Sequence, residues 1–313
     1  MTNTLHPDHD SGLTSNDPRL EVRADCPDWY RWAMAQPRET RTVVSDDCPI
    51  QYLRWEGPAE PEAGLLLVHG GGGHGHWWSF LAPFLADRFR VAAPDLSGMG
   101  DSGHRTGDYG SPVHIPEIAA VIDDAPLGAH PVVVGHSFGG YITMSYAANN
   151  GVNLSGVVIV DAAIRPGTED RDAPRAAYDR PKRYYPDKET IVGRYRLMPE
   201  QPNNHPFLLD HVAEHSVREE SAGWTWKFDI AARGAAHFQE PLSEYVRNMP
   251  CRKALIYGDE SYFMTPEVLA HMKTLFGPND PVIAIPAAHH HLTMDQPLAF
   301  VIALRTILSG WDL

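Results

Sequence analysis

Short apolar segments recur along the first half of the chain. Each is a nearly uninterrupted aliphatic run, and the runs are Gly64–Val68, Phe89–Ala93, Pro131–Val134 and Leu154–Val160. Such runs are typical of strands that are buried on both faces of a sheet. Segments of helical length lie between them, at Trp77–Ala86, Pro112–Asp124 and Phe138–Asn149. This alternation predicts an α/β fold in which a mostly parallel sheet with right-handed crossovers is flanked by helices.

An antiparallel hairpin is expected before this region, and the same alternation returns after it. Arg41–Val44 and Ile50–Trp55 flank the polar turn Ser45–Pro49, which predicts a β-hairpin of edge strands. The later elements are the strands Ala254–Tyr257 and Pro281–Ile285 and the helices Pro266–Phe276 and Pro297–Leu308. They complete the predicted sheet.

The stretch between the two halves of this pattern differs from both. Residues 165–245 carry many charges, prolines and aromatic side chains, and the strand-helix alternation is absent. Because a structureless loop of this length is uncommon in a compact domain, we expect a mostly helical insertion that acts as a lid. The α/β core then comprises residues 21–164 and 246–313. Residues 1–20 have almost no apolar side chains, so we expect a disordered tail there.

Composition fits one large domain and narrows the range of partners. The chain has 313 residues, of which 43% are hydrophobic, and 40 acidic against 26 basic residues give a formal charge of -14 at pH 7. This negative charge disfavours binding to nucleic acids and to anionic membranes. We expect a small-molecule substrate as the partner, and self-association into a homo-oligomer stays open.

The cysteines and the hydropathy profile bear on the cellular compartment. Cys26, Cys48 and Cys251 are far apart and form no C-x-x-C pair, so neither a disulfide framework nor a zinc site is indicated. The first residues lack the basic and apolar regions of a secretion signal, and the chain has no apolar run of about 18 residues. We therefore expect a cytoplasmic protein that is neither exported nor inserted into a membrane.

One serine follows a predicted strand in a context typical of a nucleophile. The segment Gly135-His136-Ser137-Phe138-Gly139 matches G-x-S-x-G and lies between the strand Pro131–Val134 and a helix. Its glycines allow chain segments to approach closely around a sharp turn, which exposes the Ser137 hydroxyl. The backbone N–H of Phe138, at the start of the helix, would then face a developing oxyanion.

The glycine-rich segment Gly70–Gly73 follows the first predicted strand, where a second oxyanion donor is required. We assign this donor to the Gly71 N–H. A phosphate-binding loop would continue with Lys-Ser or Lys-Thr, and His74-Gly75-His76-Trp77 stands there instead. Because no cysteine or carboxylate near these histidines completes a metal site, we expect packing roles for them and neither a metal nor a cofactor.

Three consecutive histidines, His289, His290 and His291, follow the last predicted strand and offer a general base. Adjacent side chains point in different directions, which makes joint metal coordination difficult. A loop that delivers a base to Ser137 needs only one correctly aimed imidazole. The residues by themselves do not decide which of the three it is.

Taken together, these segments resemble the α/β-hydrolase superfamily over about residues 41–310. The matching segments are His69-Gly70 after a strand, Ala93–Ser102, Gly135–Gly140, and Ile285–Leu292 ahead of Asp295-Gln296-Pro297. The resemblance implies an α/β-hydrolase fold. The frequent C-terminal phrase of the family is similar to I-P-x-A-x-H, which implies that His290 is the catalytic base. Asp95 resembles a turn-stabilising carboxylate of these proteins.

The acid that orients the base has two candidate positions in such proteins. In many relatives it stands three residues after a glycine that ends the penultimate strand, where this chain has Ser261. A hydroxyl cannot stabilise imidazolium as a carboxylate can. Groups resembling haloalkane dehalogenases carry the acid after the strand that follows the nucleophile helix, which implies Asp161 here. If Asp161 only closes its strand, Asp259 or Glu260 would have to serve.

A serine nucleophile makes acyl-enzyme chemistry natural, so we expect hydrolysis of a carboxylic ester, thioester or lactone. Trp77 and Trp78 beside the oxyanion loop, and the aromatic residues of the lid, indicate a substrate with an apolar or aromatic body. We include His136 among the candidate substrate-binding residues. One rival is a C–C bond hydrolase of ring-cleavage products. Another is a cofactor-independent dioxygenase or lyase in which His290 with Asp161 abstracts a proton, and a third is a ligand sensor that retains the triad.

Overall fold

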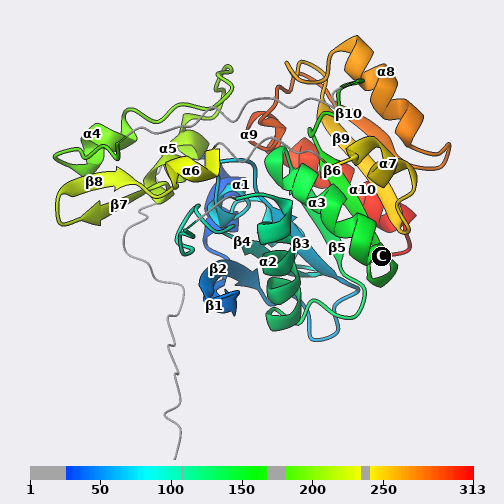
Figure 1. The fold of residues 1–313 in the computed structure, drawn as a ribbon, viewed down its shortest axis with the longest axis horizontal. Coiled ribbons are helices and arrows are strands. Elements are labelled where there is room, and N and C mark those ends of the chain that lie inside the picture. Colours follow the sequence, from blue (N-terminus) through cyan, green and yellow to red (C-terminus); the bar gives the residue numbers. More distant parts are fainter. Residues whose placement is uncertain (1–25, 107–108, 168–180, 234–239) are drawn as a thin grey trace, which may run out of the picture.

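The computed structural model describes residues 26–106, 109–167, 181–233 and 240–313, and its centre is an eight-stranded sheet (Figure 1). The strand order is β1-β2-β4-β3-β5-β6-β9-β10. The strands are β1 Glu39–Ser45, β2 Cys48–Trp55, β3 Gly64–Val68, β4 Arg90–Pro94, β5 Val132–His136, β6 Gly156–Val160, β9 Arg252–Gly258 and β10 Val282–Ile285. Strands β4, β3, β5, β6, β9 and β10 are mutually parallel. Strand β2 pairs antiparallel with both β1 and β4. The predicted mostly parallel sheet is confirmed.

Helices cover both faces of this sheet. They are α1 Asp28–Met34, α2 Ser111–Asp124, α3 Phe138–Asn150, α4 Lys188–Val192, α5 Pro206–His215, α6 Ile230–Arg233, α7 Leu242–Arg247, α8 Pro266–Leu275, α9 Leu292–Asp295 and α10 Pro297–Gly310. Residues of α2, α3, α7 and α8 pack together in one hydrophobic cluster. Residues of α1, α5, α9 and α10 belong to a second cluster on the other face.

Strand β3 shows why the central strands read as unbroken apolar runs. Leu66 and Val68 belong to the first hydrophobic cluster, and Leu65 and Leu67 belong to the second. Successive side chains of a strand point to opposite faces of the sheet. Because helices cover both faces, all of these side chains are buried, with at most 1% of their surface exposed. A polar residue at any of these positions would lose its contacts with water on either face.

Two local expectations prove wrong. The segment Trp77–Ala86 is not one α-helix: it forms two 3₁₀ turns, Gly75–Trp77 and Ala82–Phe84. Pro83 lies in the middle of the segment and has no N–H to donate, which interrupts an α-helical hydrogen-bond pattern. Strand β2 of the predicted edge hairpin is also not an edge, because it pairs with β4 on its second side.

The expectation of a mostly helical insertion at residues 165–245 is only partly met. Besides α4, α5 and α6, the described part contains an antiparallel pair of strands, β7 Val217–Glu220 and β8 Gly223–Trp226. Figure 1 shows this pair with α4 at one side of the molecule, away from α8 and β10. A lid role for the insertion stays a prediction. The predicted N-terminal tail lies outside the described residues.

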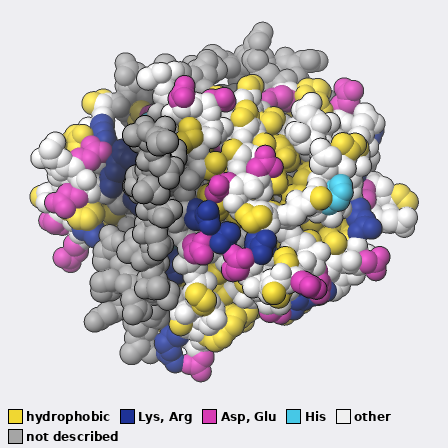
Figure 2. Space-filling view, turned by 90° about the horizontal axis from the view of Figure 1, so that it is seen from below, with side chains coloured by type: hydrophobic (Ala, Val, Ile, Leu, Met, Phe, Trp, Pro, Cys, Tyr) yellow, Lys and Arg dark blue, Asp and Glu magenta, His cyan; other side chains and the backbone are white. Residues whose placement is uncertain are grey.

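The cysteines, the helix hydropathy and the surface charge can be compared with the sequence-based expectations. All three cysteines are free thiols. Among the described residues, no helix is both long and apolar enough to cross a lipid bilayer. On the face drawn in Figure 2, the described Lys and Arg side chains are interspersed with Asp and Glu rather than gathered into one basic surface. This distribution gives a polyanion no continuous patch to bind there.

Candidate active site

Ser137 occupies the sharp turn between β5 and α3. Its backbone has φ 52° and ψ -118°, a region that non-glycine residues rarely adopt, and its N–H donates to the Val160 carbonyl at 2.9 Å. Gly135 makes the turn possible, because a Cβ there would lie 2.2 Å from Thr143 Oγ1 and 2.3 Å from the Gly139 carbonyl oxygen. The turn leaves the Ser137 side chain partly accessible above the C-terminal edge of the sheet.

Two further loops at the same edge bring a histidine and an aspartate to this serine. Ser137 Oγ lies 2.9 Å from His290 Nε2, and His290 Nδ1 lies 2.7 Å from Asp161 Oδ2. His290 follows β10 and Asp161 follows β6. Because parallel strands end at one edge of a sheet, loops far apart in sequence converge there. With Nδ1–H donating to the carboxylate, the neutral imidazole leaves Nε2 free to accept the Ser137 proton.

The Asp161 carboxylate is buried and accepts two hydrogen bonds besides the one from His290. Ser261 Oγ donates to Asp161 Oδ2 at 2.6 Å, and the Gly258 N–H donates to Oδ1 at 3.1 Å. Asp161 is 1% exposed, so these donors replace the water that an ionised carboxylate would otherwise bind. Sequence reasoning noted Ser261 only as the residue found where many relatives have the acid. Its role as a donor to Asp161 was missed.

The alternative acids lie elsewhere. Asp259 and Glu260 are both exposed. Asp259 Oδ1 accepts from the Ala288 N–H at 3.4 Å, and Glu260 Oε2 lies 3.4 Å from His289 Nε2. Neither contacts His290, so the structure brings Asp161 and not these carboxylates to the imidazole.

The glycine-rich loop after β3 lies beside the start of α3. A Cβ on Gly139 would come within 2.4 Å of the His69 carbonyl oxygen and 2.6 Å of that of Val68, so the two backbones are in contact. A Cβ on Gly71 would lie 3.5 Å from Phe138 Cβ. Among the described residues, none accepts a hydrogen bond from the Gly71 N–H. The loop therefore presents a backbone donor next to the N-terminus of α3, where the helix dipole also favours negative charge.

This contact predicts a specific sensitivity at Gly139. Gly139→Ala should lower the free energy of unfolding by about 1–3 kcal/mol, because the added methyl group collides with backbone that cannot rotate away. Urea denaturation followed by circular dichroism measures the loss. Gly310→Ala, where a Cβ meets no atom within 4 Å, is the control and should leave the midpoint unchanged or slightly raised. Equal midpoints for both variants would contradict the close packing of α3 on the loop.

His69 and Asp95 hold this loop in place. The Leu96 N–H donates to His69 Nε2 at 3.0 Å, and His69 Nδ1 donates to the Gly70 carbonyl at 2.7 Å. Burial lowers the pKa of His69 to about 4, so this pattern is that of a neutral ring at pH 7. Asp95 accepts from the N–H groups of Gly75 at 2.6 Å and Asp101 at 2.7 Å, as expected for a turn-stabilising carboxylate.

The predicted substrate-binding residues are largely buried. Trp78 is 2% exposed, and its ring centroid lies 6.0 Å from that of Phe300 in the core. The ring centroid of Trp77 lies 5.2 Å from that of His291. His136 Nε2 donates to the His290 carbonyl at 2.9 Å, and burial lowers the pKa of His136 to about 3, so this neutral ring holds the backbone of the base. Packing accounts for Trp78 and His136, and substrate contact by these residues stays a prediction.

A serine on a strand-to-helix turn, with histidine and aspartate delivered by later loops of a mostly parallel sheet, defines an α/β hydrolase. Residues 65–304 match the model of the Alpha/beta hydrolase family, and the chain belongs to this family. It is 30% identical to lipase LipV of Mycobacterium tuberculosis over 188 residues, which covers 58% of this chain and 67% of the lipase. It is 26% identical to haloalkane dehalogenase 2 of the same organism over 282 residues, which covers 83% of this chain and 92% of the dehalogenase.

The fold is also found among solved structures. The thioesterase domain from the curacin biosynthetic pathway superposes with a TM-score of 0.74 at 22% sequence identity. The match covers 86% of this chain and 99% of the thioesterase domain. At this identity the likeness shows a shared fold. The family match and the lipase relative establish the chain as a hydrolase of the α/β class.

Proposed function

We propose that this chain is a serine hydrolase that cleaves a carboxylic ester, thioester or lactone through an acyl-enzyme. The observation that carries the proposal is the continuous hydrogen-bond chain from Ser137 Oγ through His290 to the buried Asp161 carboxylate. This arrangement removes a proton from a hydroxyl and holds the resulting imidazolium beside a fixed negative charge.

In the first half of the proposed reaction, Ser137 Oγ attacks the carbonyl carbon while its proton passes to His290 Nε2. The carbonyl oxygen becomes an oxyanion, which the N–H groups of Gly71 and Phe138 stabilise. His290 then returns the proton to the leaving alcohol or thiol as its bond to carbon breaks. In the second half, water loses a proton to His290 and attacks the acyl-enzyme, and Ser137 leaves as the free hydroxyl.

Serine at position 137 disfavours an alkyl-enzyme route, although one relative is a dehalogenase. Displacement of a halide by Ser137 would form an ether, which water attack at a carbonyl cannot release. An acyl ester on Ser137 has such a carbonyl. The lipase name of one relative and the thioesterase name of a fold neighbour are in line with acyl chemistry.

An apolar or aromatic substrate body is part of the proposal. The ring centroid of Phe263 lies 4.6 Å from that of His290 in an edge-to-face arrangement. Tyr262, next to Phe263, is 74% exposed. An aromatic side chain against the catalytic imidazole, with an exposed tyrosine next to it in the chain, favours an acyl group that buries apolar surface when it binds.

A serine-directed fluorophosphonate tests the proposal directly. We expect one adduct per chain, which mass spectrometry of the digested protein locates on the peptide that contains Ser137. Turnover is measured in parallel on p-nitrophenyl esters, acyl thioesters, lactones and a ring-cleavage dienoate. Turnover of the dienoate alone would favour the C–C hydrolase. Oxygen consumption on a heteroaromatic substrate without an adduct would overturn the serine-hydrolase proposal.

The oxyanion donor in the loop after β3 can be removed by one substitution. Gly71→Pro eliminates the N–H and should lower kcat for a p-nitrophenyl ester by about 10²–10³-fold, or about 2.7–4 kcal/mol of barrier stabilisation. Gly71→Ala retains the N–H, and its Cβ meets Phe138 only at an ordinary contact distance of 3.5 Å, so its kcat should stay near wild type. If both variants kept the wild-type kcat, the donor would have to be another group.

A further inference from the structure

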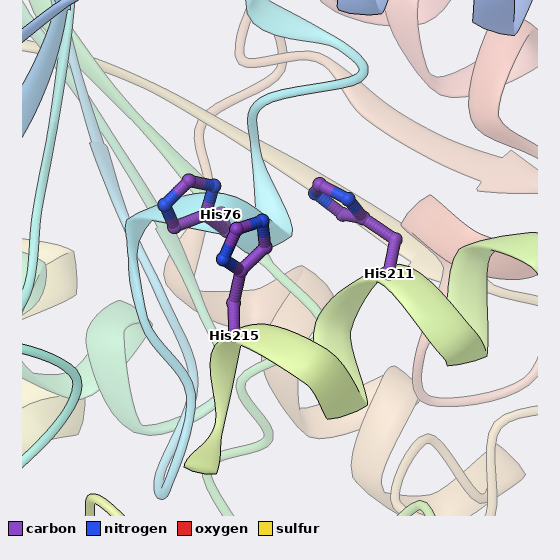
Figure 3. A group of neighbouring side chains, drawn as sticks. All are labelled: His76, His211 and His215. Atoms are coloured by element: carbon purple, nitrogen blue, oxygen red, sulfur yellow. The ribbon is translucent and has the colours of Figure 1, made fainter. Parts of the chain in front are cut away.

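Histidines gather where α5 of the insertion packs against the turn that follows the oxyanion loop. His211 and His215 lie one turn apart on α5, so their side chains share a face of the helix. His76 comes from the 3₁₀ turn Gly75–Trp77 after β3. Figure 3 shows the His76 and His215 rings close together, with the His211 ring to one side of them. One nitrogen from each ring lies within 4.8 Å of those of the other two.

The contacts among these rings leave nitrogens unused. The rings of His76 and His215 are stacked, with centroids 3.5 Å apart and planes 9° apart, and the His211 centroid lies 4.7 Å from that of His215. Within the described part of the chain, His76 Nδ1, His211 Nδ1 and His215 Nε2 are buried and have no hydrogen-bond partner. Buried polar atoms are normally satisfied, so three such nitrogens in one group point to a ligand that they share.

A neutral imidazole is the form that donates a lone pair, and burial favours that form for each of the three rings. Burial lowers the pKa of His76 and of His215 well below 6.5, and each is also lowered by neighbouring histidines. Burial and the charge of Arg38 lower the pKa of His211 to about 3.

We propose that His76, His211 and His215 form a binding site for a divalent transition metal ion, with Zn²⁺ the ion that best fits three imidazoles. The site ties α5 of the insertion to the segment that carries the oxyanion donor. Imidazole nitrogens suit Zn²⁺, Cu²⁺ and Ni²⁺, whereas Mg²⁺ and Ca²⁺ prefer oxygen ligands, which this group lacks. A three-histidine set leaves a fourth tetrahedral position for water.

Neighbouring groups hold the segments that carry these histidines in place. Ser79 Oγ lies 2.8 Å from His211 Nε2, the kind of contact that fixes the tautomer and orientation of a metal ligand. His74 Nε2 lies 3.0 Å from Ser216 Oγ and 3.1 Å from the Val212 carbonyl, which joins the turn to α5 independently of any ion. Ligand nitrogens on tetrahedral zinc are about 3.4 Å apart for Zn–N bonds of about 2.1 Å. Binding therefore brings the nitrogens closer together than the present spacing of up to 4.8 Å, and the stacked His76 and His215 rings rotate out of their parallel arrangement so that both lone pairs face one ion.

Sequence reasoning excluded a metal here because the segment around His74 and His76 contains no further ligand. The missing ligands come from α5, more than a hundred residues later in the chain. The nearby cations Arg38 and Lys227, which lower the pKa values of these histidines, also oppose an added positive charge. We therefore expect a metal that forms strong bonds to nitrogen to bind and Mg²⁺ not to bind.

The test is a Zn²⁺ titration of the full chain after treatment with a chelator, in competition with a chromophoric chelator. We expect one equivalent for the wild type. His76→Gln and His215→Gln should each weaken binding by more than about 100-fold, and Ser79→Ala by about 10–100-fold. His130→Gln, on an exposed loop, is the matched control and should bind like the wild type. Co²⁺ in place of Zn²⁺ should give the intense visible bands of tetrahedral nitrogen ligation without a thiolate band.

A second histidine group, His136, His290 and His291, lies at the triad and provides the competing outcome. An ion there would occupy His290 and block Ser137, so it would inhibit ester turnover. If His291→Gln abolished Zn²⁺ binding while His215→Gln retained it, the proposed site would be wrong. Absence of both Zn²⁺ binding and a Co²⁺ spectrum in the wild type would also overturn it.

Circular dichroism of each variant tests whether it is folded. Should a histidine variant fail to fold, the Co²⁺ spectrum of the wild type decides whether the site exists. Zn²⁺ binding and the Co²⁺ spectrum are measured without substrate, so their result does not depend on the proposed hydrolase activity.

Discussion

Replacing Ser137 by alanine should lower kcat for ester hydrolysis by about 10⁶-fold, the loss seen when the nucleophile of a comparable triad is removed. The hydroxyl supplies the atom that becomes acylated, and among the described residues Ser137 is the one whose hydroxyl contacts His290 Nε2. The measurement is steady-state hydrolysis of the best p-nitrophenyl ester from the substrate panel. The same variant should acquire no fluorophosphonate adduct.

The control for this experiment is a serine at the opposite edge of the sheet. Ser155 precedes β6, and its hydroxyl donates to the His130 carbonyl at 2.7 Å. Ser155→Ala should hydrolyse the ester and acquire the label like the wild type. If Ser137→Ala kept the wild-type rate within about tenfold, a mechanism in which His290 and Asp161 abstract a proton and the serine only orients the substrate would be favoured.

Asp161→Asn should lower kcat by about 10⁴-fold while the fold stays intact. Gly258 N–H donates to Oδ1 at 3.1 Å, which holds the amide oxygen of asparagine at that position and turns its NH₂ group toward His290. His290 Nδ1 must then accept a hydrogen bond, so the imidazole proton moves to Nε2. In that tautomer Nε2 cannot accept the proton of Ser137. The rate with the same ester and the thermal unfolding midpoint together measure the effect.

A carboxylate introduced at a second position near His290 gives a further test of this prediction. Ser261 Oγ lies 2.6 Å from Asp161 Oδ2, close to the oxygen that His290 contacts. In the Asp161→Asn background, Ser261→Asp should therefore recover part of the lost rate. Asp259→Asn and Glu260→Gln are exposed substitutions and should change the rate by no more than about twofold. A collapse of activity in Asp259→Asn with normal activity in Asp161→Asn would reverse the assignment of the acid.

Most of the core elements could be predicted from the sequence, because each has a local pattern that survives folding unchanged. The apolar runs of β3, β5 and β6 reflect burial on two faces, which any parallel central strand must have. Prediction failed where a short local signal differed from the surrounding pattern. Pro83 divides the segment expected to be a single helix, and the alternating Gly223–Trp226 forms a strand within a region expected to be mostly helical.

The sequence by itself determined the nucleophile motif and the glycine-rich loop, because a turn of two or three residues can be recognised from its own glycines. Only the tertiary structure decided which carboxylate faces His290, since Asp161, Ser261 and His290 come from three separate loops. The same holds for His76, His211 and His215, which two distant segments bring together. Contacts between loops depend on how the strands are ordered in the sheet, and that order is a property of the whole chain rather than of any segment.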